Sequence, residues 1–193
     1  VFGLWDRALK YITPEEKEKF SKFIDHGIAN LEPDYQCSLP DCDDRLPANI
    51  SRILPPKSLG YRMKIYTLSL TRKFSEALEP YNVTTNHWVV LCRLWKQDGI
   101  TTMEIGKWVD QVGGTLTGLL ERMEERGLIT RSLDTADKRR ILVYLTADGK
   151  ALYDKLPPIA AQILDESTAG LKVEDVDFMR EMLRRIARGL EES

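Results

Sequence analysis

Residues 127–149 decide the fold of this chain; they read GLITRSLDTADKRRILVYLTADG. Across residues 141–145 the side chains alternate as expected for a half-buried strand, and residues 128–131 predict a shorter strand. The run between them, residues 133–140, is polar and charged, which is typical of a hairpin tip. This stretch therefore predicts a two-stranded β-hairpin, and Gly127 in front of it is expected to end a helix in the left-handed conformation.

Short helices are expected before the hairpin. One should begin near Thr85, and the next is predicted by Thr101 and Glu104, which have the spacing of a capping box. Gly113 and Gly114 then separate that helix from a third one. The expected core positions of the third helix are Leu116, Leu119, Leu120 and Met123.

Longer helices should flank this segment. Apolar residues recur at helical steps from Ser58 until Pro80, and Thr146 is expected to cap a helix that Pro157 and Pro158 kink or interrupt. A final amphipathic helix is predicted over about residues 173–190. Its expected apolar face consists of Val176, Met179, Leu183, Ile186 and Leu190.

The N-terminal part has a different character. Thr13, Pro14 and Glu16 together predict the start of a helix, and Gly27 is interpreted as its stop. The following stretch, residues 33–56, is rich in proline and contains an acidic run, so it is expected to be irregular. Residues 1–56 are thus interpreted as an appendage.

These patterns predict a mainly α-helical fold, a winged helix-turn-helix with a two-stranded hairpin wing and N- and C-terminal dimerisation helices. The expected divisions are an N-terminal extension at 1–56, a first core helix at 57–83, a winged helix-turn-helix at 84–146 and C-terminal dimerisation helices at 147–193.

Helices followed by a hairpin in this order are the arrangement of a DNA-binding module. The helix from Thr102 would be the support, and the helix from Gly114 would present its first residues to base edges in the major groove. The cations Lys138, Arg139 and Arg140 would reach the flanking backbone or minor groove from the hairpin tip. The candidate DNA-contacting residues are Thr102, Gly114, Thr115, Thr117, Arg122, Lys138, Arg139 and Arg140.

Each feature also has a purely structural interpretation. Gly113 and Gly114 could form only a tight turn, and a basic hairpin tip is often just a solvated loop. The formal net charge is -2, from 28 basic and 30 acidic residues, so any DNA-binding role must come from local placement of charge. The ordered combination across one continuous segment is what favours DNA binding.

The quoted stretch closely resembles the signature of the MarR family of bacterial and archaeal transcriptional regulators. That signature has a helix end GL(I/V)xR, matched by residues 127–131, then a wing DxR, matched by residues 137–139, and LTxxG, matched by residues 145–149. Residues 59–61 and 88–91 look like the starts of that family's first and second core helices. The resemblance covers roughly residues 57–190.

The resemblance implies a homodimer that reads a near-palindromic operator in double-stranded DNA, with half-sites roughly 10 base pairs apart. It also implies that Arg139 is aimed at the minor groove and that Asp137 helps to orient it. Gly118 departs from the family, because many relatives carry a basic or polar residue there. Its presence suggests a close backbone approach, either to DNA or to a neighbouring helix.

Most such proteins are repressors relieved by a small ligand, an oxidant or a metal. Cys37 and Cys42 suggest a redox pair, although the acidic residues around them argue against an activated thiolate. His26 with these cysteines could supply metal ligands, but no zinc-type spacing appears, so no metal site is predicted. Cys92 is expected to be a buried packing residue.

Among these possible signals, a small organic effector is favoured. It would bind between the dimerisation helices and the reading domain. The residues proposed to line its pocket are Tyr66, Leu70, His87, Trp88 and Tyr153. They can equally be interpreted as core residues.

Other classes of function fit less well. A winged-helix module used only for protein–protein assembly is the main rival, and Arg139 would then have no role. The two histidines lie far apart and no phosphate loop or paired nucleophile and base is present, so neither enzymatic activity nor a cofactor is predicted. Without an apolar run long enough to span a bilayer or a signal-peptide pattern, the protein is expected in the cytoplasm of a bacterium or archaeon.

Overall fold

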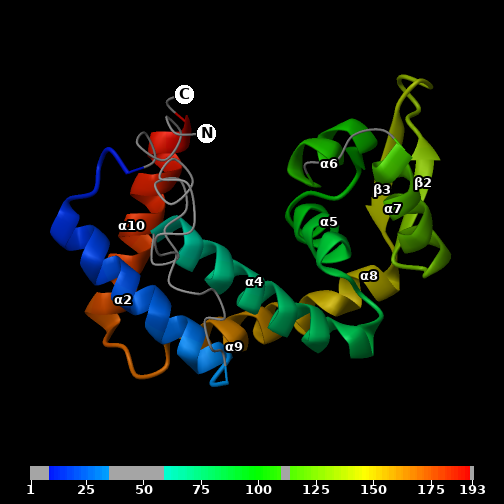
Figure 1. Ribbon diagram of the computed structural model, residues 1–193. Coiled ribbons are helices and arrows are strands. Elements are labelled where there is room, and N and C mark those ends of the chain that lie inside the picture. Colours follow the sequence, from blue (N-terminus) through cyan, green and yellow to red (C-terminus); the bar gives the residue numbers. More distant parts are fainter. Residues whose placement is uncertain (1–8, 35–58, 110–113, 192–193) are drawn as a thin grey trace, which may run out of the picture. The chain divides into compact units, whose positions relative to one another are not determined.

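The computed structural model describes residues 9–34, 59–109 and 114–191 of the chain (Figure 1). They form two compact units. The helical unit comprises the chain up to Lys73 and from Gln162 on, and the winged unit comprises Phe74–Ala161. Of the helices in these ranges, none combines the length and the apolar character needed to cross a membrane.

The helical unit is built from α2 (Pro14–Leu31), the first part of α4 (Leu59–Leu78), the end of α9 (Leu156–Thr168) and α10 (Val173–Glu191). Helix α2 begins at the predicted capping box of Thr13 and Glu16. Its apolar face is buried together with α4 and α10, so α2 is part of the core of this unit. That core consists of Phe20, Ile24, Ile28, Leu59, Met179, Met182 and Ile186.

The prediction that Gly27 stops the first helix is wrong. Helix α2 continues to Leu31, and Gly27 is buried inside it. A Cβ atom at Gly27 would lie 2.7 Å from the ring of Tyr66 and 3.2 Å from the carbonyl oxygen of Ser167. The glycine therefore serves close packing of helices and not helix termination.

The predicted apolar face of α10 is confirmed only in part. Met179 and Ile186 are buried, whereas Leu183 and Leu190 keep 47% and 40% of their surface exposed. Met182, which lies outside the predicted face, is fully buried. The reason is that α2 and α4 cover one side of α10, and Leu183 and Leu190 lie beyond that side.

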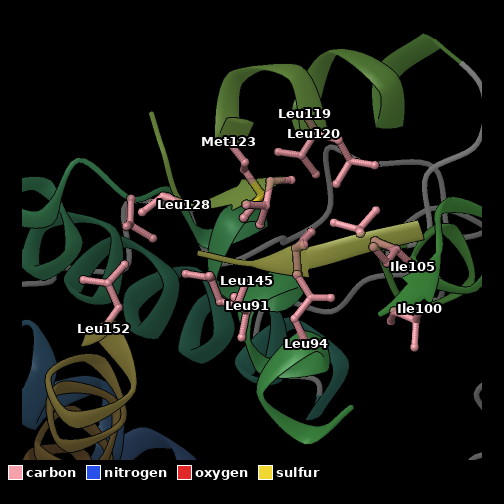
Figure 2. Close-up of a cluster of buried hydrophobic side chains, with 14 of the residues drawn as sticks. Leu91, Leu94, Ile100, Ile105, Leu119, Leu120, Met123, Leu128, Leu145 and Leu152 are labelled. Atoms are coloured by element: carbon pink, nitrogen blue, oxygen red, sulfur yellow. The ribbon is translucent and has the colours of Figure 1, made fainter. Parts of the chain in front are cut away.

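The winged unit contains the predicted order of short helices followed by a hairpin. Its elements are η1 (Glu79–Tyr81), α5 (Thr85–Lys96), β1 (Ile100–Thr101), α6 (Thr102–Val109), α7 (Gly114–Glu125), β2 (Ile129–Leu133), β3 (Ile141–Leu145), α8 (Ala147–Ala151) and η2 (Leu152–Asp154). Figure 2 shows the cluster of leucine, isoleucine and methionine side chains that these elements bury between them. The four predicted core residues of the helix from Gly114 all belong to this cluster.

The sheet has one strand more than predicted. It is antiparallel in the order β1-β3-β2, and the short strand β1 pairs Ile100 with Val143 and Thr101 with Leu142. Two residues are too few to show a strand period, so only the pairing in the folded chain reveals β1. Through β1, the start of α6 is attached directly to the wing hairpin.

The segment after the wing differs from expectation in its details. Thr146 caps α8 as predicted, and Gly127 has φ +67, as predicted for a left-handed helix end. The helix that Thr146 caps ends before the prolines, because the 3-10 turn η2 follows α8. Pro157 and Pro158 instead lie in the first turn of α9. That position suits proline because the first backbone N–H groups of a helix have no partner within the helix.

Candidate nucleic-acid interface

The support helix α6 begins at a complete capping box. The Thr101 N–H donates to the Glu104 carboxylate at 2.8 Å, and the Glu104 N–H donates to Thr101 Oγ1 at 3.2 Å. The Thr101 hydroxyl also donates to Glu104 at 2.7 Å, and these hydrogen bonds lower the pKa of the Glu104 carboxyl. Thr102, a predicted DNA contact, is half-buried directly after the cap. The cap thus fixes the end of α6 nearest to strand β1.

The reader helix α7 has one buried and one exposed side. Leu116, Leu119, Leu120 and Met123 face the core, and the predicted DNA contacts Thr115, Thr117 and Arg122 are exposed. Gly114 opens the helix, as predicted. The exposed side of the first turns therefore carries hydroxyls and small residues, which allow the backbone to come close to a ligand.

No neighbouring helix accounts for Gly118. A Cβ atom at this position would meet only the Arg122 guanidinium, at 3.4 Å. Of the two close approaches suggested by the sequence, packing against another helix is therefore ruled out within the described chain.

The wing tip is organised around Asp137. Its carboxylate accepts hydrogen bonds from the backbone N–H and the Nε of Arg139, both at 3.1 Å, and lies 3.6 Å from Arg140 Nε. The hydrogen bonds from the Arg139 side chain and backbone lower the pKa of Asp137. The Arg139 side chain nevertheless stays 91% exposed. The expected contact between Asp137 and Arg139 is present, and its role in DNA binding stays a prediction.

A groove of about 410 Å³ connects the wing with the support helix. It brings Arg139 and Arg140 together with Lys107 of α6, which sequence reasoning missed. Lys107 is exposed, and its position three residues after Glu104 on the same short helix was the available signal. The residues that line the groove are Thr101, Thr102, Met103, Glu104, Lys107, Arg139, Arg140 and Ile141. The groove is cationic because its lining contains three cations and one carboxylate, that of Glu104.

The reader helix and the wing are tied to each other by an ion pair that the sequence did not reveal. Arg131 on β2 donates from its backbone N–H and its Nε to Glu124 on α7, at 2.8 and 2.9 Å. The hydrogen bond from the Arg131 side chain is the main reason that the pKa of Glu124 is lowered. The arginine of the GL(I/V)xR motif is therefore used to hold the wing against the reader helix.

The LTxxG motif builds the corner between β3 and α8. The Thr146 hydroxyl donates to the Gly127 carbonyl and accepts from the Gly149 N–H. A Cβ atom at Gly149 would lie 2.1 Å from the Leu128 carbonyl oxygen, so only glycine fits there. Trp95 Nε1 donates to the Gly149 carbonyl at 3.0 Å. This motif joins the base of the wing to the helices.

Two of the predicted effector-pocket residues belong to the helical unit. The Tyr66 hydroxyl lies 2.8 Å from Ser167 Oγ, and burial raises its pKa. Leu70 is half-buried on α4. The interpretation of Tyr66 as a core aromatic is therefore supported by its contacts.

The other three predicted effector-pocket residues belong to the winged unit. His87 is only 2% exposed and completes the cap at the start of α5, with Nδ1 accepting the Thr84 N–H at 3.2 Å. Trp88 and Tyr153 are members of a row of edge-to-face aromatic rings with centroid distances of 5.1–5.6 Å, formed by Phe74, Trp88, Trp95 and Tyr153. His87 thus has a structural role, while Tyr153 keeps 57% of its surface exposed.

A second hollow, of about 310 Å³, lies inside the winged unit next to this aromatic row. Its lining consists of Leu94, Trp95, Asp98, Leu145, Lys150 and Tyr153. Asp98 accepts the Leu145 N–H at 2.8 Å and lies 3.6 Å from Lys150 Nζ. The hollow therefore borders the end of the wing strand β3.

The cysteines divide into two groups. Cys37 and Cys42 lie outside the described residues. The prediction that Cys92 is buried is wrong, because the residue is exposed on the outer side of α5. Partial burial of its thiol raises the pKa to about 11, which leaves little thiolate at neutral pH. Within the described ranges, no three His, Cys, Asp or Glu side chains are grouped as metal ligands.

Comparisons with known proteins agree with this geometry. The family model described as MarR family matches residues 83–141. The organic hydroperoxide resistance transcriptional regulator of Bacillus subtilis is 36% identical over 95 residues, which are 49% of this chain and 65% of that protein. The HTH-type transcriptional regulator TtmR of Methylorubrum extorquens is 30% identical over 136 residues, 68% of this chain and 67% of TtmR.

A solved structure of Staphylococcus aureus MepR in complex with DNA is also similar. Its TM-score is 0.63 at 26% identity, and the similarity covers 69% of this chain and 98% of MepR. Fold and site together define a winged helix-turn-helix protein. The chain belongs to the MarR family of transcriptional regulators. The predicted family and the predicted fold class are thereby confirmed.

Proposed function

We propose that this protein binds duplex DNA sequence-specifically and represses transcription. The observation that carries the proposal is the surface of the winged unit, where the hydroxyl-bearing start of α7 lies in the same unit as a wing whose Arg139 is 91% exposed. A helix of this kind fits the major groove, and an arginine at a wing tip fits the minor groove. MarR-family membership and the DNA-bound relative support the same conclusion.

The contacts divide by type. Gly114, Thr115 and Thr117 face base edges, and the uncovered backbone at Gly118 lets the reader helix approach them closely. Lys138 contacts the DNA backbone beside the wing. Phosphate oxygens are contacted by the cations Lys107, Arg122 and Arg140, with Thr102 beside the same groove. This division predicts that the phosphate contacts determine affinity and that α7 and Arg139 determine sequence preference.

The protein acts in this proposal as a homodimer joined through the helical unit. Dimers of this class read half-sites about 10 base pairs apart, so a near-palindromic operator is expected. In such a complex each winged unit reads one half-site. As a transcriptional regulator the protein is proposed to act in the cytoplasm and to catalyse no reaction.

The test is a titration of the full-length protein into labelled duplex DNA, followed by fluorescence anisotropy. The DNA comes from the region upstream of its gene and, in parallel, from selection out of a random-sequence pool. Saturable, sequence-selective binding that weakens with salt is expected, because binding releases counterions from phosphates. Absence of selective binding from both sources would instead favour a module for protein–protein assembly.

Arg139→Ala is expected to weaken binding to the selected site by about tenfold and to relax the sequence preference at the base pairs that the wing contacts. The matched control is Arg184→Ala, which removes another largely exposed arginine, from α10 in the helical unit. It should stay within about twofold of the unchanged protein. Equal losses in both variants would show that only overall charge matters.

We further propose that a small planar organic molecule releases the protein from DNA by binding in the hollow beside Tyr153. Trp95 and Tyr153 offer ring surfaces there, and Asp98 links the hollow to strand β3. A ligand found by screening should quench tryptophan fluorescence and lower DNA affinity, and Tyr153→Ala should weaken both effects. If mild oxidation releases the DNA and Cys37→Ser with Cys42→Ser abolishes that release, the redox alternative holds instead.

A further inference from the structure

The C-terminal end of the reader helix α7 is held on two sides. On the wing side, Glu124 pairs with Arg131 at 2.8 Å. On the other side, Arg126, which directly follows α7, donates from Nη1 to the carbonyl of Asn82. Asn82 ends the turn η1 with φ +53, the one positive φ of a non-glycine residue in the described chain. The second tether therefore joins the end of α7 to the segment that leads into α5.

His87 lies at the centre of this second tether. Its Nδ1 accepts the Thr84 N–H at 3.2 Å and lies 3.5 Å from Arg126 Nη1. Thr84 Oγ1 in turn accepts the His87 N–H at 3.3 Å, so the histidine takes the place that glutamate or glutamine has in a capping box. One nitrogen atom thus faces both the cap of α5 and the cation at the end of α7.

This geometry requires a neutral imidazole with its proton on Nε2. Nδ1 must keep its lone pair to accept the Thr84 N–H, and a proton there would also face the Arg126 guanidinium. The charged groups that act on His87 are Arg126 and Arg122, both from the α7 side. Burial, followed by these two arginines, lowers the pKa of His87 to about 4, which agrees with the neutral form.

We propose that His87 is a positioning residue for DNA reading, which acts through Arg126 to set the C-terminal end of α7 against the start of α5. This inference rests on the proposed DNA binding. Because α7 is one continuous helix of 12 residues, a shift at its C-terminal end moves the Thr115 and Thr117 end as well. Base contacts depend on small displacements, so selectivity for the operator should depend on a residue that does not touch DNA.

The experiment is a double-mutant cycle on DNA affinity with His87→Ala and Arg126→Ala in the full-length protein. Each single variant is expected to lose about tenfold in affinity for the selected site, and the double variant should lose little more. His87→Gln supplies a neutral acceptor at the same capping position and should recover most of the loss. His87→Lys, which introduces a cation beside Arg126, should bind worst.

Thr84→Ala is the matched control. It removes the other half of the same capping box without touching Arg126, so its thermal midpoint should fall as in His87→Ala. Its DNA affinity should stay within about twofold of the unchanged protein. If Thr84→Ala loses as much affinity as His87→Ala, or if the two losses in the cycle simply add, the role of His87 is only structural and the inference is overturned.

A second measurement separates this inference from the proposed function. In the DNA-free protein, His87→Ala should shift the backbone amide resonances of Thr115 and Thr117, whereas Thr84→Ala should shift only those at the start of α5. If the unchanged protein binds no DNA, the proposed function fails. The resonances of Thr115 and Thr117 still test whether His87 positions α7. If they do not move in His87→Ala, the positioning role is wrong.

Discussion

Single residues at the corner between wing and helices carry much of the geometry of the interface. Gly149 has no room for a side chain, because a Cβ atom would lie 2.1 Å from a backbone oxygen that cannot move independently. Gly127, at the other side of the same corner, has φ +67 but nothing within 4 Å of a Cβ atom. The two glycines are therefore required for different reasons.

These reasons predict different costs of substitution. Gly149→Ala should reduce the free energy of unfolding by about 3 kcal/mol or more, because the backbone of the wing must shift. Gly127→Ala should cost about 1 kcal/mol, since only the left-handed conformation is unfavourable. Urea unfolding of both variants measures the difference. Equal losses would mean that the corner is more adaptable than the structure indicates.

The buried His87 predicts how stability depends on pH. Its pKa is about 4 in the fold and about 6.5 when unfolded, so between these values the unfolded chain binds more protons. Stability contributed by the neutral histidine is thus present above about pH 6.5 and is lost as the pH falls towards 4. The loss should approach about 3 kcal/mol.

The measurement is the free energy of unfolding from urea titrations between pH 7 and 4.5. In His87→Gln the slope over this range should be clearly smaller, because one titrating group has been removed. The carboxylates remain the same in both proteins and cancel in the comparison. An unchanged slope would show that His87 is already protonated in the fold or keeps its ordinary pKa.

At the scale of elements, α2 is the helix whose importance is least visible in the sequence. It buries Phe20, Ile24 and Ile28 against α4 and α10. It also carries an Asp25–Arg62 pair at 2.7 Å and a His26 ring nitrogen that lies 2.7 Å from the Ala169 carbonyl oxygen beyond α9. Helix α2 therefore connects three other helices of the helical unit.

Phe20→Ala should accordingly destabilise the protein by about 3–5 kcal/mol, as expected for a fully buried phenylalanine. Lys22→Ala on the outer side of α2 removes only an exposed pair with Glu18 and should change stability by less than about 0.5 kcal/mol. Thermal and urea unfolding compare the two. A small effect of Phe20→Ala would mean that α2 is an appendage after all.

At the scale of the whole molecule, we propose that the protein dimerises through the exposed apolar stripe of α10. Val176, Leu183 and Leu190 follow one another at seven-residue steps and so lie along one side of the helix. In the single chain, Leu183 and Leu190 are substantially exposed. An apolar stripe of this kind fits a second copy of the same helix.

The combined change Leu183→Glu with Leu190→Glu should convert the dimer to a monomer in sedimentation velocity. DNA affinity should fall strongly, because each half-site is then bound independently. Arg184→Glu, which lies on α10 but outside the stripe of Val176, Leu183 and Leu190, also introduces a carboxylate and should leave the dimer intact. A dimer that survives the double change would place the interface on another surface.

The sequence by itself determined the order of helices and hairpin in the winged unit, the capping boxes at Thr13 and Thr101, and the left-handed Gly127. These features depend on local spacing and local hydrogen bonds, which neighbouring residues encode. The family followed from the same stretch, because its motif residues build one local corner. Thr115, Thr117 and Arg139 could therefore be identified as candidates before the structure was known.

Only the tertiary structure decided what depends on residues far apart in the chain. The packing of Gly27 against Tyr66, the exposure of Leu183, and the exposure of Cys92 depend on which helices cover which faces. Distant segments also come together in strand β1, in the Lys107 groove and in the tether from His87 to Arg126. Local sequence periodicity does not predict these contacts. The physical reason is that burial and long-range hydrogen bonds are properties of the packed molecule, whereas turns, caps and helix starts are properties of short sequences.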